Sequence, residues 1–110
     1  MRTHRRAPHH IDNIPLTHHA WKRLSERGIG RLGLLAAFYF GREILERGRG
    51  ASILFIGRKE VARARRGGFD IKEYKGIHVV CSQDGRVITL YRNQELNRSR
   101  ARRAFRRRAA

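Results

Sequence analysis

Acidic residues and cysteine are both scarce in this chain of 110 residues. Nine Asp and Glu stand against 26 Lys and Arg, which gives a formal net charge of +17. A charge of this size repels itself unless a polyanion neutralises it, and nucleic acid is the commonest such partner. The single Cys81 excludes an internal disulfide, which fits a reducing compartment, so we expect a cytoplasmic protein.

Long apolar runs and metal-ligand patterns are missing from the sequence as well. No stretch approaches the ~18–20 apolar residues that a membrane helix requires, so we expect no membrane partner. The N-terminus is basic without a following apolar run, which argues against a secretory signal and leaves an organellar presequence open. With one cysteine and no His-x3-His on a predicted helix, we expect no metal site and no cofactor.

The length predicts one domain with two basic extensions. A chain of 110 residues with 40% hydrophobic residues can build one modest core. We expect residues 1–15 to form a basic irregular arm, because Pro8 and Pro15 break any helix there. Residues 16–94 would form a single α+β domain, and residues 95–110 an arginine-rich tail.

The tail carries the densest charge of the chain. It holds seven arginines and no acid between residues 98 and 108. These side chains repel one another without a counterion, so we expect the isolated tail to be partly disordered. They are our candidates for phosphate contacts with nucleic acid: Arg98, Arg100, Arg102, Arg103, Arg106, Arg107 and Arg108.

A first helix is predicted over 18–27 by signals at both of its ends. Thr17 is a suitable N-cap, and Gly28 suits the left-handed position that follows a helix. Leu24 and Ile29 would then form the hydrophobic pair of a Schellman ending.

The remaining elements alternate between apolar and turn-forming stretches. Residues 31–40 are apolar on nearly every side, so we expect a buried helix there. Residues 42–47 and 51–57 read as two strands, and 58–66 as either a short basic helix or an irregular crossing. The most distinctive pattern is a β-hairpin over 77–92.

The hairpin pattern also predicts which side chains share a face. If Asp84 and Gly85 form a two-residue type I′ turn, the strand register follows from it. The core face would then hold Ile77, Val79, Cys81, Ile88 and Leu90, which makes Cys81 a buried structural residue. The outward face would hold His78, Val80, Ser82, Thr89 and Tyr91.

The outward face has three readings. It could be an ordinary half-exposed sheet face. Its His78, Thr89 and Tyr91, flanked by Arg92, could instead bind RNA by stacking and phosphate contact. They could also cleave RNA, since a base for the 2′-hydroxyl, an acid for the leaving oxygen and a cation for the phosphorane suffice.

A second candidate patch lies on the first predicted helix. His19, Arg23 and Arg27 are spaced at i, i+4 and i+8, so they share one stripe beside the apolar face. The alternative interpretation is a solvated helix face.

Three segments of the sequence also carry a family pattern. Residues 17–29 read T-x-H-A-x-x-R-x-x-x-R-G-I, a short apolar segment ends at Gly41, and residues 87–93 read V-I-T-x-Y-R-N. This combination resembles a family of small bacterial domains of unknown function over roughly residues 17–93. The stretch 58–76 and the basic tail are not part of that pattern.

These domains resemble RelE-like ribonuclease toxins in layout, with helices followed by a small antiparallel sheet. The resemblance implies RNA cleavage and often an antitoxin partner, here an acidic protein. It points to His19, Arg23 and Thr89 as functional residues, with Tyr91 and Arg92 as their neighbours.

The sequence therefore predicts an α+β domain in which two N-terminal helices pack on a small antiparallel sheet. Our first hypothesis is an RNA-directed, metal-independent ribonuclease of the RelE-like type. His19 or His78 would serve as base or acid, and Arg23 with Arg92 would hold the phosphate. The alternatives are a non-catalytic RNA- or ribosome-binding module and a basic interaction protein for an acidic partner.

Overall fold

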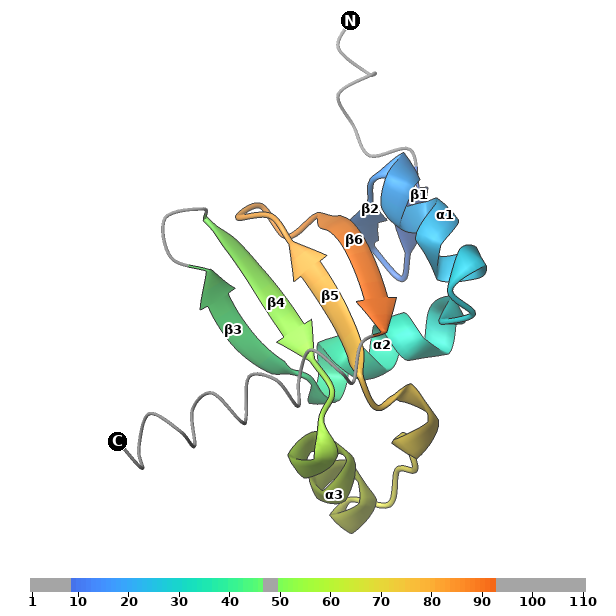
Figure 1. Cartoon of the computed structure of the whole chain (residues 1–110), viewed down its shortest axis with the longest axis vertical. Coiled ribbons are helices and arrows are strands. Elements are labelled where there is room, and N and C mark those ends of the chain that lie inside the picture. Colours follow the sequence, from blue (N-terminus) through green and yellow to red (C-terminus); the bar gives the residue numbers. More distant parts are fainter. Residues whose placement is uncertain (1–8, 47–49, 93–110) are drawn as a thin grey trace, which may run out of the picture.

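The computed structural model describes residues 9–46 and 50–92, which form an α+β fold (Figure 1). Three α-helices, one 3-10 helix and a six-stranded sheet with the order β1-β2-β6-β5-β4-β3 lie in this part of the chain. The strands are β1 His9–Ile11, β2 Ile14–Leu16, β3 Arg42–Glu46, β4 Ala51–Phe55, β5 Ile77–Cys81 and β6 Val87–Arg92. The helices are α1 His18–Glu26, α2 Gly30–Phe40, α3 Arg58–Arg66 and the 3-10 helix η2 Lys72–Tyr74.

The α+β class and the two N-terminal helices are confirmed, but the purely antiparallel sheet is wrong. β2 pairs with β6 in parallel, through Leu16 and Val87, while the other neighbouring strands are antiparallel. The ambiguous stretch 58–66 is a helix, α3. None of the described helices is both long and apolar enough to span a bilayer.

Part of the expected irregular arm is instead a β-hairpin. Residues 9–16 form β1 and β2, joined by Asp12 and Asn13 with φ angles of 49° and 71°. Short polar side chains tolerate this left-handed backbone, so the pair makes a tight two-residue turn. The prolines do exclude a helix here, but they do not prevent two short strands. Residues 1–8 lie outside the described part of the chain, as do residues 93–110 with the arginine-rich tail.

Both ends of α1 are as the sequence predicts. The Thr17 hydroxyl accepts a hydrogen bond from the Ala20 N–H at 3.1 Å. At the other end the Ile29 N–H donates to the Leu24 carbonyl at 3.0 Å, beside Gly28 with its φ of +63°. The Thr17 hydroxyl also donates to the Ile88 carbonyl at 3.0 Å, so the same residue that starts α1 ties it to β6.

The core lies between one face of the sheet and the two N-terminal helices. Figure 1 shows α2 behind the sheet, with α1 beside β1 and β2. From α2 the core takes Leu34, Ala36 and Ala37, and from the hairpin it takes Ile77, Val79, Cys81, Val87 and Leu90. The expectation that α2 is buried all round is wrong, because the sheet covers only one side of it and leaves Leu32 and Tyr39 exposed.

The hairpin over 77–92 is confirmed, but its turn is longer than predicted. The Gly85 N–H donates to the Ser82 carbonyl at 3.0 Å, and the Ser82 N–H donates to the Arg86 carbonyl at 2.9 Å. This leaves three loop residues, with Gly85 in the left-handed region at φ +89°. Asp84 stabilises the loop through Ser82 and the Arg86 N–H, and the hydrogen bond from Ser82 is the main cause of its lowered pKa.

The longer turn changes one predicted register pair. Cys81 pairs with Val87 instead of Ile88, and an irregularity beside Val80 restores the predicted pairing of Val80 with Thr89. Ile88 is the extra residue, so it is exposed, and Val87 takes the core position predicted for it. Cys81 is buried as predicted, and burial raises the pKa of its thiol to about 11, which keeps the thiolate scarce at neutral pH.

Candidate nucleic-acid interface

A row of rings crosses the sheet face that points away from α1 and α2. The strand register places Arg42, Phe55, His78 and Tyr91 side by side on β3, β4, β5 and β6. The ring centroids of Phe55 and His78 are 4.8 Å apart, as are those of His78 and Tyr91, and the latter two rings are nearly parallel at 14°. The Arg42 guanidinium lies 5.5 Å from the Phe55 ring centroid, so the row ends in a cation.

His78 is the buried centre of this row. The residue is only 2% exposed, and its Nδ1 lies 2.9 Å from the Gly76 carbonyl oxygen. A carbonyl only accepts, so Nδ1 must carry the proton in this bond. Phe55 is buried too, whereas Tyr91 is half-buried at the end of the row. His78 therefore fixes the orientation of Tyr91, and Tyr91 is the ring that a ligand can reach.

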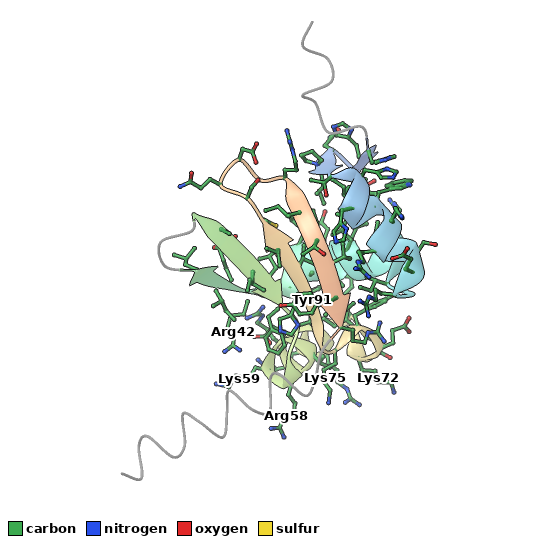
Figure 2. The ribbon with its side chains drawn as sticks, turned by 45° about the horizontal axis from the view of Figure 1, so that its top comes forward. Arg42, Arg58, Lys59, Lys72, Lys75 and Tyr91 are labelled. Carbon is green, nitrogen blue, oxygen red and sulfur yellow. The ribbon has the colours of Figure 1, made fainter. Side chains whose placement is uncertain are left out.

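Cations gather at the same end of the sheet as Tyr91. Neighbouring central strands run in opposite directions, so the starts of β3 and β5 meet the ends of β4 and β6 there. Figure 2 shows basic side chains from β3, α3 and the η2 region around this end, extending outward from it. We call this set the basic rim: Arg42, Arg58, Lys59, Lys72 and Lys75.

The Glu60 carboxylate contacts both the start of α3 and β3 next to the basic rim. The Glu60 side chain is 4% exposed, and its Oε1 accepts a hydrogen bond from the Gly57 N–H at 2.7 Å. Its Oε2 lies 3.8 Å from Nε of Arg42. The carboxylate thus joins the start of α3 to β3 and sets where Arg58 and Lys59 lie.

Gly57 is needed where β4 passes into α3. A Cβ at this position would come within 2.5 Å of Cε2 of Phe55, closer than side-chain carbons approach in proteins. The ring row and the position of α3 therefore depend on the same close packing.

The predicted patch on α1 makes no ring or polar contact with Tyr91 in the described residues, although α1 itself packs against β6. Arg23 Nε donates to His19 Nε2 at 3.4 Å, which agrees with the predicted stripe, and Arg23 also lies 3.5 Å from Glu26. Among residues 9–46 and 50–92, no hydrogen bond, ion pair or ring contact joins these two side chains to Tyr91. Arg27 is exposed just after the helix.

The structure thus brings together only some of the predicted site residues. His78 and Tyr91 stack, Thr89 lies half-buried on the same face next to Val80, and Arg92 is exposed at the end of β6. The basic rim was missed by the sequence analysis. Its only signal in the sequence is that the five cations stand near the ends of predicted strands. The strand order is needed to show that these ends lie together.

The part of the chain that the structure describes contains no group of three or more His, Cys, Asp or Glu side chains placed to hold a metal ion. Against protein-family models, curated proteins and solved structures, the chain has no match. The resemblance to small bacterial domains and to RelE-like toxins therefore stays a prediction from the sequence motifs.

Proposed function

We propose that this protein is an RNA-directed, metal-independent ribonuclease of the RelE-like type, and that single-stranded RNA lies over the Tyr91 end of the sheet. The observation that carries the proposal is the combination of the partly exposed Tyr91 ring, stacked on His78, with the basic rim. The rim's cations come from separate segments of the fold, so they spread over a surface as a nucleic-acid backbone requires.

Stacking and charge together favour single-stranded RNA over other polyanions. An unpaired base stacks on an aromatic side chain, a contact worth roughly 1–3 kcal/mol, while Lys and Arg follow the phosphates. A duplex keeps its bases inside the helix and offers Tyr91 nothing to stack on. The chain's net charge of +17 adds attraction at long range.

The same residues provide the chemistry of a metal-free cut. Attack of the 2′-oxygen on the adjacent phosphorus breaks the bond to the 5′-oxygen and gives a 2′,3′-cyclic phosphate. Water takes the proton of the 2′-hydroxyl, Tyr91 donates its own proton to the departing 5′-oxygen, and solvent then reprotonates Tyr91. The basic rim stabilises the charge of the phosphorane. His78 acts through Tyr91 as a positioning residue. His19 and Arg23 are the second candidate pair for proton transfer and phosphate contact.

One observation favours the alternative, an RNA- or ribosome-binding module without catalysis. His78 is 2% exposed, and in the described residues no other histidine contacts Tyr91. An imidazole is the usual base for a 2′-hydroxyl at neutral pH. A face without a reachable imidazole still stacks bases and holds phosphates.

Cleavage in the presence of excess EDTA tests the proposal. We expect purified protein to cut mixed RNA under these conditions, and the Tyr91→Phe variant to cut at least ~100-fold more slowly, because it keeps the stacking ring and loses the proton-transfer group. His10→Ala removes an exposed histidine of β1 and should cut like wild type.

Two other outcomes would change the assignment of the catalytic residues or of the function itself. Loss of cleavage in His19→Ala, with Tyr91→Phe fully active, would place the chemistry on α1. If folded wild-type protein binds RNA and cuts none, including RNA on translating ribosomes, the binding-module alternative replaces the ribonuclease.

A further inference from the structure

An apolar groove lies on the side of α2 that the sheet leaves uncovered. It has a volume of ≈ 510 Å³ and runs between α2 and the segment from Phe69 to Tyr74. Leu32, Leu35 and Tyr39 line one wall, and Phe69, Ile71 and Tyr74 line the other. We propose that this groove binds an acidic amphipathic helix of another protein. The proposal does not depend on the assignment to RNA.

The apolar side chains in the groove are exposed to an unusual degree. Leu32 is 61% exposed, Tyr39 79% and Phe69 58%. Leu32, Leu35 and Tyr39 recur at helical spacing, so they form one stripe along α2, on the side opposite Gly33, Leu34 and Ala37. A contiguous exposed apolar surface of this kind marks an interaction site more often than a chance feature.

The shape of the groove suits a helix. α2 has 11 residues, so at 1.5 Å per residue the groove wall is about 16 Å long. This is enough for two to three turns of a partner helix that presents apolar residues at i, i+3 or i+4, and i+7, which is a common mode of peptide recognition.

Charge next to the groove favours an acidic partner. Phe69 and Asp70 line both the groove and a second hollow of ≈ 290 Å³, which Arg65 and Lys72 also line. The last turn of α3 adds Arg63 and Arg66, and the Arg63 side chain donates to the Phe40 carbonyl at the end of α2. A helix seated on the apolar stripe therefore has an excess of cations beside it, and Asp or Glu on its flank would be attracted.

The groove and the basic rim differ in the ligand that they suit. Among the described residues no lysine or arginine lines the groove, and its one charged side chain, Asp70, repels phosphate, whereas the rim combines one ring with five cations. We therefore assign the groove to a protein partner, and treat RNA or a second copy of this chain as outcomes of the test.

The test uses a fluorescein-labelled helical peptide of about four turns, with leucine at i, i+3, i+4 and i+7 and mostly glutamate elsewhere. Fluorescence anisotropy with the full chain should show binding at least ~10-fold tighter than for a scrambled peptide of the same composition or for a lysine version. The Leu32→Ser/Tyr39→Ser variant should lose that preference. Leu45→Ser, which changes an exposed leucine on β3, should keep it.

Several results would overturn the proposal. Equal binding of the designed and scrambled peptides would show charge attraction alone, and absence of binding would show that the groove does not take an acidic helix. If Leu32→Ser/Tyr39→Ser weakens the binding of a single-stranded RNA oligonucleotide, the groove belongs to the nucleic-acid surface. If the wild type is a dimer that the same variant dissociates, a second copy is the occupant.

Discussion

Tyr91→Ala is expected to weaken binding of single-stranded RNA by roughly 5- to 150-fold at fixed salt. Tyr91 is the reachable ring of the row, and loss of one base stack costs roughly 1–3 kcal/mol. Tyr91→Phe should bind within a few-fold of wild type, because the phenyl ring stacks equally well. Anisotropy titrations with a short labelled oligonucleotide measure both variants.

Trp21→Ala is the matched control for this prediction. Trp21 is an exposed aromatic residue of α1 that stacks on His9 at 4.5 Å, away from the Tyr91 row. Its removal should change RNA affinity little. If Trp21→Ala weakens binding more than Tyr91→Ala does, the bases stack on the α1 side of the molecule and the interface has been assigned to the wrong surface.

Glu60→Ala is expected to lower the free energy of unfolding by about 2–3 kcal/mol. The substitution leaves the Gly57 N–H without its carboxylate acceptor, and a hydrogen bond to a charged group contributes roughly 1.5–3 kcal/mol. The ion pair with Arg42 adds little, because the Arg42 side chain is half exposed and its charge is screened by solvent. Urea unfolding followed by circular dichroism measures the change.

Glu60→Gln provides the comparison for this stability prediction. The amide oxygen can still accept from Gly57, so the loss should be about 1 kcal/mol, roughly that of exchanging a charged acceptor for a neutral one. Since Glu60 also sets the position of Arg58 and Lys59, the folded fraction of Glu60→Ala should bind RNA more weakly. Equal stability of wild type and Glu60→Ala would mean that α3 is held by its other contacts.

Features governed by local chemistry could be predicted from the sequence. Thr17 as an N-cap and Gly28 as a left-handed helix end follow from the conformational preferences of single residues, and both are confirmed. Strands were predicted at 42–47 and 51–57 and are found at 42–46 and 51–55. The signal was two runs rich in Ile, Leu and Phe on either side of the glycines at 48 and 50.

Features that depend on distant segments could not be predicted. The parallel pairing of β2 with β6 joins residues about seventy positions apart, and nothing near Leu16 specifies it. The exposed Ile88 results from a three-residue turn in place of the expected two-residue turn, a difference set by the hydrogen bonds of Asp84.

In the candidate site, too, local sequence patterns predict some residues, and the position of others depends on distant segments. Alternation along the hairpin placed His78 and Tyr91 on one face, and they do stack. That Phe55 and Arg42 continue their row depends on β4 and β3 joining the sheet in that order and register. The basic rim forms only when these strands assemble. The positions of basic residues in the sequence therefore indicated the tail and α1 as phosphate-binding surfaces, and not the rim.

Lysine footprinting tests most directly whether RNA lies over the Tyr91 end of the sheet. The chain has only four lysines. Lys59, Lys72 and the half-buried Lys75 belong to the basic rim, and Lys22 is exposed on α1. Acetylation of the free and RNA-bound protein, read by mass spectrometry, should show RNA slowing the reaction at Lys59 and Lys72 while Lys22 reacts as before. High salt should remove that protection. Protection of Lys22 with Lys59 and Lys72 unchanged would contradict the account.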